Sequence, residues 1–323
     1  MTNLANELSQ GQLGALGSSA SQPHVRERVR RRWSLKPLPL VLPFIVLYLL
    51  FVIVPTVGIV LKGFTRNATL GIEILNAASW PDLQFTLDNY STLFGNNFSR
   101  NMIVNTIVIA GTSVVLTTII GTLVAYELAI GRTRFAAAVR WIISLPIYLP
   151  SVVVAYSLLL FLGPNGMLNS LVAPLGLNFD LAYSPLAVAL GTTFVLLPIH
   201  IRVVSAAFEK IPQNVIEASY SLGAGELRTL RSVIIPVAVP SILAALILNF
   251  AFAVGMVEIA LIVGGGGLRV PYLPVDILQR TMSFSPDVSL TSAMSTILIV
   301  IALAAQAISM IVVRKSGRGG AAQ

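Results

Sequence analysis

Six long apolar runs alternate with short polar segments along the 323 residues of the chain. A helix needs about 20 apolar residues to cross the hydrocarbon core of a bilayer, and each run is close to or above that length. The predicted spans are residues 38–61, 102–129, 141–162, 186–204, 242–263 and 292–313. The pattern therefore predicts an all-α membrane protein with six transmembrane helices.

The third run is interrupted by two prolines, Pro146 and Pro150. Each proline removes a backbone donor and clashes with the preceding turn, so this span is predicted to be kinked or broken. Gly163–Gly166 then predicts a turn outside the membrane, and an amphipathic or re-entrant segment leads from it to Tyr183.

Composition agrees with a membrane location, because 55% of residues are hydrophobic and only 11% are charged, whereas soluble domains carry about 25% charge. Cysteine is absent, which excludes disulfides and thiolate chemistry in this chain. The two histidines, His24 and His200, are far apart in sequence, so no His-rich metal site is predicted.

The two ends of the chain are polar and basic. Residues 1–37 are predicted to be a disordered, basic cytoplasmic tail, and residues 314–323 a cytoplasmic C-terminal tail. The basic run before residue 38 resembles the start of a signal peptide, but the apolar run after it is too long and lacks a small-residue cleavage site. Orientation in the membrane explains these arginines better than binding to nucleic acid, which is not predicted.

The distribution of Lys and Arg predicts the topology. Sixteen of the 21 basic residues fall in the segments that six spans place inside, and five fall outside. This asymmetry satisfies the positive-inside rule. Both termini and the polar segment 210–236 are therefore expected in the cytoplasm, and the domain from 38 to 313 is the membrane domain.

The segment 210–236 is too charged for lipid, yet it has the pattern of ordered structure. Pro212 suits the first turn of a helix, and Gly223 allows a sharp corner. A second helix would begin near Glu226, and Pro236 would end it. We expect a helix, a glycine corner and a second helix at the membrane surface.

This segment resembles the "EAA" loop of permease subunits in binding-protein-dependent ABC importers. The loop pattern is Glu-Ala-Ala, three residues, Gly, nine residues and Ile-x-Leu-Pro. The matching residues here are Glu217, Ala218, Ser219, Gly223, Val233, Ile235 and Pro236. Ser219 replaces an alanine, and Val233 and Ile235 are apolar exchanges. The resemblance extends from about residue 38 to 313 and implies the type I importer permease fold with a cytoplasmic coupling helix.

In such importers the loop docks into a groove on a separate ATPase subunit, so the resemblance implies a coupling role. The candidate coupling residues are Glu217, Ala218, Ser219, Gly223, Arg228, Arg231 and Pro236. Glu217 is the strongest of these candidates, although it could simply offset a helix dipole. The chain has no phosphate-binding Gly-x4-Gly-Lys motif. It is therefore expected to be non-catalytic, without a cofactor or metal, and ATP and Mg are expected on the partner ATPase.

The resemblance also implies an assembly in the bacterial cytoplasmic (inner) membrane. Two ATPase subunits, a second permease subunit and an extracytoplasmic substrate-binding protein are the expected partners. Six spans are too few to enclose a large pathway, so a dimer of permeases is expected. A heterodimer is favoured because the branch of the family that this chain resembles, described below, commonly pairs different permeases, and a homodimer remains open.

Four polar residues within or near the spans are candidates for the substrate pathway: Asn105, Thr106, Asn249 and Glu258. The first three could instead hold helices together. Glu258 could snorkel to the interface or pair with Arg269. Glu127 is expected to pair with Arg132 or Arg134.

The Asn-Thr pair and the Leu-Pro-x3-Pro motif at residues 145–150 resemble a branch that serves spermidine/putrescine, ferric iron, sulfate, thiamine and aminoethylphosphonate. A polyamine has a slight advantage because Glu258 offers a negative charge. The alternatives to an importer subunit are a secondary transporter or channel, a membrane enzyme and a membrane scaffold without an ATPase. Uptake that depends on ATP rather than on an ion gradient would favour the importer.

Overall fold

The computed structural model describes residues 38–66, 68, 84–131, 135–177, 179, 181–267 and 269–319. The described residues are helical and contain no strand beyond one isolated bridge between Thr65 and Phe85. Six helical stretches in this part are long and apolar enough to cross a membrane. The prediction of an all-α protein with six spans is thus confirmed. The tail 1–37, Arg132 and Arg134 lie outside the described residues.

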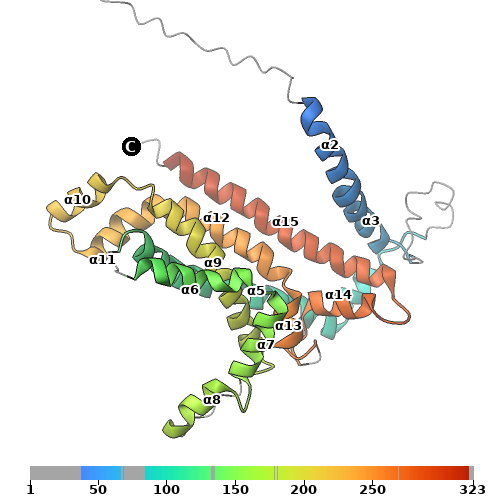
Figure 1. Cartoon of the computed structure of the whole chain (residues 1–323). Helices are drawn as coiled ribbons and strands as arrows, with labels where there is room; N and C mark the ends of the chain where they lie inside the picture. The colour runs from blue at the N-terminus through green and yellow to red at the C-terminus, as the bar shows by residue number, and fades with distance from the viewer. Residues whose placement is uncertain are drawn as a thin grey trace, which may run out of the picture. The chain divides into compact units, whose positions relative to one another are not determined.

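Figure 1 shows the arrangement of the helices along the chain. They are α2 (Leu38–Tyr48), a π-helical turn (Leu49–Ile53), α3 (Val54–Gly63), α4 (Asp88–Gly95), α5 (Asn97–Ala129), α6 (Ala136–Tyr148), α7 (Ser151–Leu162), α8 (Met167–Val172), a 3-10 turn (Ala173–Leu175), α9 (Pro185–Phe208), α10 (Gln213–Ser221), α11 (Glu226–Thr229), a second π-helical turn (Leu230–Ile234), α12 (Ile235–Val254), α13 (Val257–Ile262), α14 (Leu273–Thr281) and α15 (Val288–Gly319). The chain divides into two units, Met1–Phe51 and Val52–Gln323. Helix α2 belongs to the first unit, and the bundle described below lies in the second.

Helices α5 and α9 pack along much of their length and form the centre of the bundle. Thr193 of α9 donates its hydroxyl to the carbonyl of Ser113 on α5 at 3.2 Å. Further along, Gly121 lets the α5 backbone approach His200, since a Cβ at this glycine would lie 2.7 Å from His200 Cδ2. Small residues and interhelical hydrogen bonds of this kind are what hold helices together in lipid.

His200 joins three helices through its two ring nitrogens. The side chain is fully buried. Asn249 Nδ2 of α12 lies 3.1 Å from Nδ1, and Thr122 Oγ1 of α5 lies 3.2 Å from Nε2. An amide nitrogen can only donate, so Nδ1 accepts and Nε2 carries the hydrogen that is donated to Thr122. The imidazole is therefore a neutral link between α5, α9 and α12.

Replacing His200 with leucine is expected to lower the thermal unfolding midpoint in detergent. The change leaves the Asn249 amide buried without this partner, which costs about 1–3 kcal/mol, or roughly 3–10 °C for a domain of this size. Differential scanning fluorimetry of purified protein measures the shift. Thr122→Ser keeps the hydroxyl and serves as the control with little expected change. An unchanged midpoint for His200→Leu would contradict the role of the link.

The third predicted span, 141–162, is broken, as the two prolines predicted, but its bounds were wrong, because the stretch long enough to cross a membrane is Ser151–Leu175. Helix α6 ends at Tyr148, and α7 begins at Ser151. Leu149 takes an extended conformation with φ −92° and ψ 140°, because a residue that precedes proline is disfavoured in the helical region. Pro146 is accommodated inside α6.

The fifth span differs from the prediction at both ends. Pro236 does not end a helix, because α11, the π-helical turn and α12 run on continuously from Glu226 to Val254. The wide π-helical turn, which ends two residues before Pro236, relieves the clash and missing donor that a proline imposes. The other π-helical turn likewise ends two residues before a proline, Pro55. At its far end α12 stops at Val254 rather than at Val263.

Candidate functional site

Helix α10 is an exposed helix that lies at one end of the bundle, where α5 and α9 finish. Pro212 precedes its first residue. Ile216 and Ser219 are its buried residues, and Ile216 joins an apolar cluster with Leu128 and Phe208 from the ends of α5 and α9. This apolar contact anchors α10 to the bundle, while most of its other side chains, Glu217 among them, are exposed.

The corner after α10 has the geometry that the sequence predicted. Gly223 has a φ of +81°, in the left-handed region that favours glycine. Helix α11 begins three residues later with Glu226 in its first turn. The helix, glycine corner and second helix are therefore confirmed, although the second helix continues into the fifth span. Arg228 and Arg231 are exposed along it.

Glu217 is the fifth residue of the nine-residue α10, and its side chain is exposed. A carboxylate there is too far from the first turn to offset the helix dipole, so that alternative role is wrong. Glu217 borders a hollow of about 640 Å³ that is also lined by Glu127, Glu209 and Glu226. Arg140 lies 3.5 Å from Glu209. The pairing of Glu127 with Arg132 or Arg134, which was predicted from sequence, involves arginines outside the described residues.

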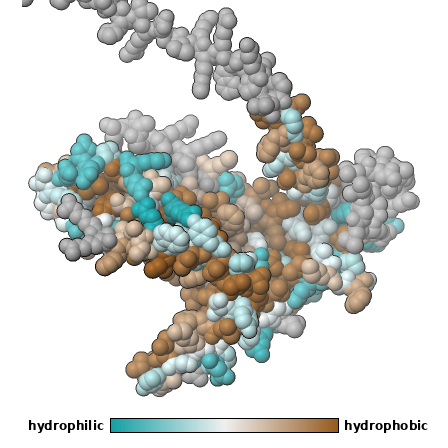
Figure 2. Space-filling view, viewed as in Figure 1, coloured by the Kyte–Doolittle hydropathy of each residue, from teal (hydrophilic) through white to brown (hydrophobic). Residues whose placement is uncertain are grey.

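Two large apolar side chains project from the corner itself. Leu222 is 88% exposed and Leu227 is 81% exposed. The surrounding surface is hydrophilic, and Figure 2 shows such side chains gathered at the end of the molecule that carries α10 and α11. Exposed apolar side chains rimmed by polar residues are typical of protein–protein interaction sites. We call the surface formed by Glu217, Leu222 and Leu227 the α10 face.

Asn105 and Thr106 hold a chain segment at the opposite end of α5. Asn105 Nδ2 donates to the carbonyl of Pro271 at 3.2 Å, and Thr106 Oγ1 accepts from the N–H of Leu273 at 3.0 Å. Thr106 is fully buried. Both side chains therefore fix the start of α14, in line with the alternative that they hold structural elements together.

Replacing Thr106 with valine is expected to loosen the start of α14. Valine has nearly the same shape but cannot accept the hydrogen of Leu273 N–H, and a buried unpaired donor costs about 1–3 kcal/mol. Faster hydrogen exchange at residues 271–275, followed by mass spectrometry, measures the effect. Thr106→Ser keeps the acceptor and is the matched control. Equal exchange in both variants would contradict the assigned hydrogen bond.

The other two pathway candidates differ in exposure. Asn249 is fully buried against His200, as described above. Glu258 is half-buried and lies in the first turn of α13, a short helix separated from α12 by Gly255 and Met256. The sequence had predicted that Glu258 lies inside a continuous fifth span from 242 to 263. That prediction is wrong, because α12 ends at Val254. Within the described part of the chain no ion pair joins Glu258 to Arg269, whose guanidinium instead lies 4.9 Å from the centre of the Tyr183 ring.

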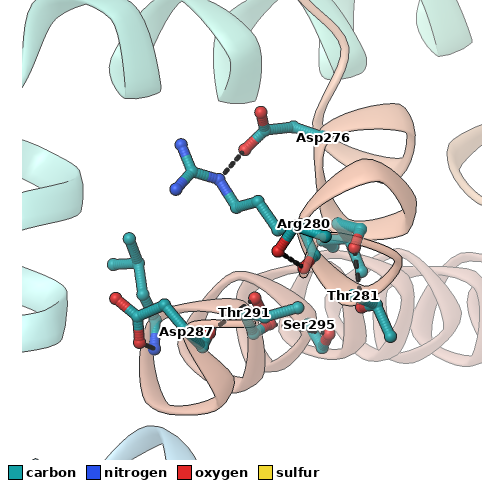
Figure 3. Close-up of polar contacts among 9 residues, drawn as sticks. Asp276, Arg280, Thr281, Asp287, Thr291 and Ser295 are labelled. Carbon is teal, nitrogen blue, oxygen red and sulfur yellow. Dashed lines mark hydrogen bonds and ion pairs between the residues drawn. The ribbon is translucent and has the colours of Figure 1, made fainter. Parts of the chain in front are cut away.

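The remaining carboxylates near α14 have structural partners (Figure 3). Asp276 accepts from Arg280 Nε at 2.6 Å within α14. Asp287 accepts from the N–H of Leu290 at 3.0 Å and so caps the start of α15. Glu258 differs from Asp276 and Asp287, because among the described residues its carboxylate neither caps a helix nor forms an ion pair.

Sequence reasoning missed several residues that organise the bundle. Of these residues, His200 could have been recognised from the sequence, because an ionisable residue within an apolar run indicates a buried polar contact. Tyr272 is fully buried and donates to the carbonyl of Ala253 at 2.8 Å, close to the break after α12. Ser219 and Thr229 share a buried hydrogen bond of 2.9 Å. Neither contact has a local sequence signal.

Comparison with known proteins identifies the family. Residues 117–318 match the family described as "Binding-protein-dependent transport system inner membrane component". The chain is 33% identical over 160 residues to the molybdenum transport system permease protein ModB of Azotobacter vinelandii, covering 50% of this chain and 70% of the relative. It is 26% identical over 219 residues to the spermidine/putrescine transport system permease protein PotB of Haemophilus influenzae, covering 67% and 73%.

A solved structure shows the same fold. The bacterial ABC transporter involved in import of the acidic polysaccharide alginate has a chain that matches with a TM-score of 0.71 at 18% identity, over 86% of this chain and 94% of that one. The family match covers well over half of the present chain and includes the α10 face. The chain therefore belongs to the binding-protein-dependent transport system inner membrane components and is a permease subunit of an ABC importer.

Proposed function

We propose that the α10 face is the docking surface for a separate ATPase subunit, and that the chain forms half of a substrate pathway driven by that ATPase. The observation that carries the proposal is the exposure of Glu217 on α10, Leu222 just after it and Leu227 on α11, where Ile216 anchors α10 to the ends of α5 and α9. A rigid, exposed element of this kind can transmit a displacement to the spans. ATP and Mg bind the ATPase, and this chain supplies no catalytic residue.

The proposed topology places the α10 face and both termini in the cytoplasm of a bacterial cell, with α14 on the outer side. The excess of basic residues in the segments assigned to the inside supports this orientation. The proposed assembly contains two ATPase subunits, a second permease that differs from this one, and an extracytoplasmic binding protein.

For the substrate, we propose a small cationic solute, with a polyamine such as putrescine or spermidine as the first candidate. Two features support it: similarity to permeases named for spermidine/putrescine transport, and the carboxylate of Glu258 near the outer end. A small oxyanion is the second candidate, because the ModB relative shares 33% identity. The cognate binding protein decides between them when titrated with putrescine, spermidine, molybdate and sulfate by isothermal calorimetry.

Affinity purification of the chain from its native membrane in mild detergent tests the docking proposal. Mass spectrometry is expected to find an ATPase with a Walker motif, a second permease and a binding protein. The double variant Leu222→Ser, Leu227→Ser is expected to lose the ATPase, because it removes the exposed apolar contacts. Phe284→Ser is the matched control, since Phe284 is also fully exposed but lies between α14 and α15. Retention of the ATPase by the double variant would contradict the proposal.

A further inference from the structure

Backbone hydrogen bonds do not cross the corner between α10 and α11. The N–H groups of Leu222, Gly223 and Ala224 bond back to carbonyls of α10, and the N–H of Thr229 bonds to Gly225 at the start of α11. A Cβ built at Gly223 or Gly225 would meet no atom within 4 Å. The two glycines of the corner thus make no side-chain contact, and side chains hold α10 to the second helix: Ile216 packs in one apolar cluster with Leu230 and Ile234, and one polar pair adds a directed link.

The hydroxyls of Ser219 and Thr229 supply such a link. Their oxygens lie 2.9 Å apart, one on α10 and the other on α11. Ser219 is 9% exposed and Thr229 is fully buried, so water does not compete for the bond. Ser221 offers a contrast within the same helix, because it is exposed and its hydroxyl bonds to the carbonyl of Glu217 in α10 itself.

Thr229 is well placed to transmit motion because it stands at the entrance to the fifth span. The π-helical turn Leu230–Ile234 follows it directly, and Leu230 and Ile234 are buried in the apolar cluster at the ends of α5 and α9. Helix α12 continues from that turn. A π-helical turn is a local irregularity that often marks a functional position in a helix.

We infer that Ser219 and Thr229 are positioning residues that hold α10 rigidly to the start of the fifth span. A displacement applied to the α10 face then moves α12 instead of bending the glycine corner. This inference rests on the proposed docking of an ATPase on α10, and it adds the element through which the displacement reaches the spans.

The two hydroxyls predict a distinctive pattern of variants. Ser219→Ala and Thr229→Val each break the link, so each is expected to make the corner flexible. The double variant is expected to be no more flexible than either single variant, because both singles already remove the same bond. Thr229→Ser keeps a hydroxyl and should behave like the unmodified protein, and Ser221→Ala should do so as well.

Electron paramagnetic resonance tests this pattern without knowledge of the transported solute. The chain has no cysteine, so nitroxide labels on Asn214→Cys and Leu248→Cys report the distance between α10 and α12 alone. Both positions are exposed. The permease is measured in lipid nanodiscs, with and without its ATPase. The distance distribution is expected to be narrow in the unmodified protein and about twofold wider in Ser219→Ala, Thr229→Val and the double variant.

The outcomes distinguish a failure of this inference from a failure of the proposed docking of an ATPase on the α10 face. Unchanged widths in Ser219→Ala and Thr229→Val would overturn the inference even if the ATPase binds normally. Failure of the unmodified permease to bind any ATPase would overturn the proposed docking. It would also overturn the role of Ser219 and Thr229 in transmitting motion, because that role depends on the docking. Wider distributions in the two single variants, with intact ATPase binding and narrow distributions in both controls, would support the inference.

Discussion

Replacing Glu217 with lysine is expected to reduce ATP-driven uptake by at least about tenfold while leaving membrane insertion unchanged. The side chain is exposed in the middle of α10, so the change disturbs no packing within the chain. It reverses the charge of the α10 face, and the introduced ammonium is attracted to Glu209 and Glu226 around the adjoining hollow. A partner group that meets the carboxylate in the native complex then meets a positive charge.

Uptake into proteoliposomes and the amount of ATPase purified with the permease measure this effect. Asn101→Lys adds a positive charge at an exposed position near the opposite end of α5 and serves as the control. Glu217→Gln, which removes the charge without reversing it, is expected to show an intermediate loss. Uptake by Glu217→Lys within about twofold of the unmodified protein would exclude a role for this carboxylate in coupling.

Replacing Gly223 with valine is expected to have a comparable effect through the backbone. Its φ of +81° lies where a residue with a Cβ is strained by about 1–2 kcal/mol, and a β-branched residue is the least tolerant of this region. The space around the glycine is open, so the strain comes from conformation alone. The corner is expected to change its path and misdirect α10, reducing uptake roughly tenfold without loss of the spans.

Gly225 provides a matched comparison two residues away. It is equally free of neighbouring atoms, but its φ is −75°, which any residue adopts. Gly225→Val should therefore retain uptake. Asparagine and aspartate tolerate the left-handed region better than valine, so Gly223→Asn and Gly223→Asp are expected to be milder. Equal losses at both glycines would show that the positive φ of Gly223 is not the cause.

Features that depend on local sequence were predicted well. The number of spans follows from long apolar windows, the break before Ser151 from Pro150, and the corner from Gly223. Each of these depends on residues that are adjacent in the chain, where steric and hydrophobic rules act directly.

The errors arose where distant residues decide the local conformation. Pro236 continues a helix because the preceding turn is π-helical and Ile234 is buried against the ends of α5 and α9. The stop after Val254 coincides with the bond from Tyr272 to the carbonyl of Ala253, 19 residues away in the chain. The roles of Thr106 and of the Ser219–Thr229 pair likewise depend on contacts that only the packed bundle brings together.

Site-specific cross-linking from the α10 face tests the central claim most directly. Because the chain contains no cysteine, Glu217→Cys and Ser221→Cys each introduce the single thiol for a bifunctional reagent in native membranes. Phe284→Cys provides the control position between α14 and α15. The account predicts that both α10 positions form a covalent product with the ATPase and that Phe284→Cys does not. Efficient labelling of the α10 thiols without any ATPase product, in membranes where the assembled transporter is active, would contradict it.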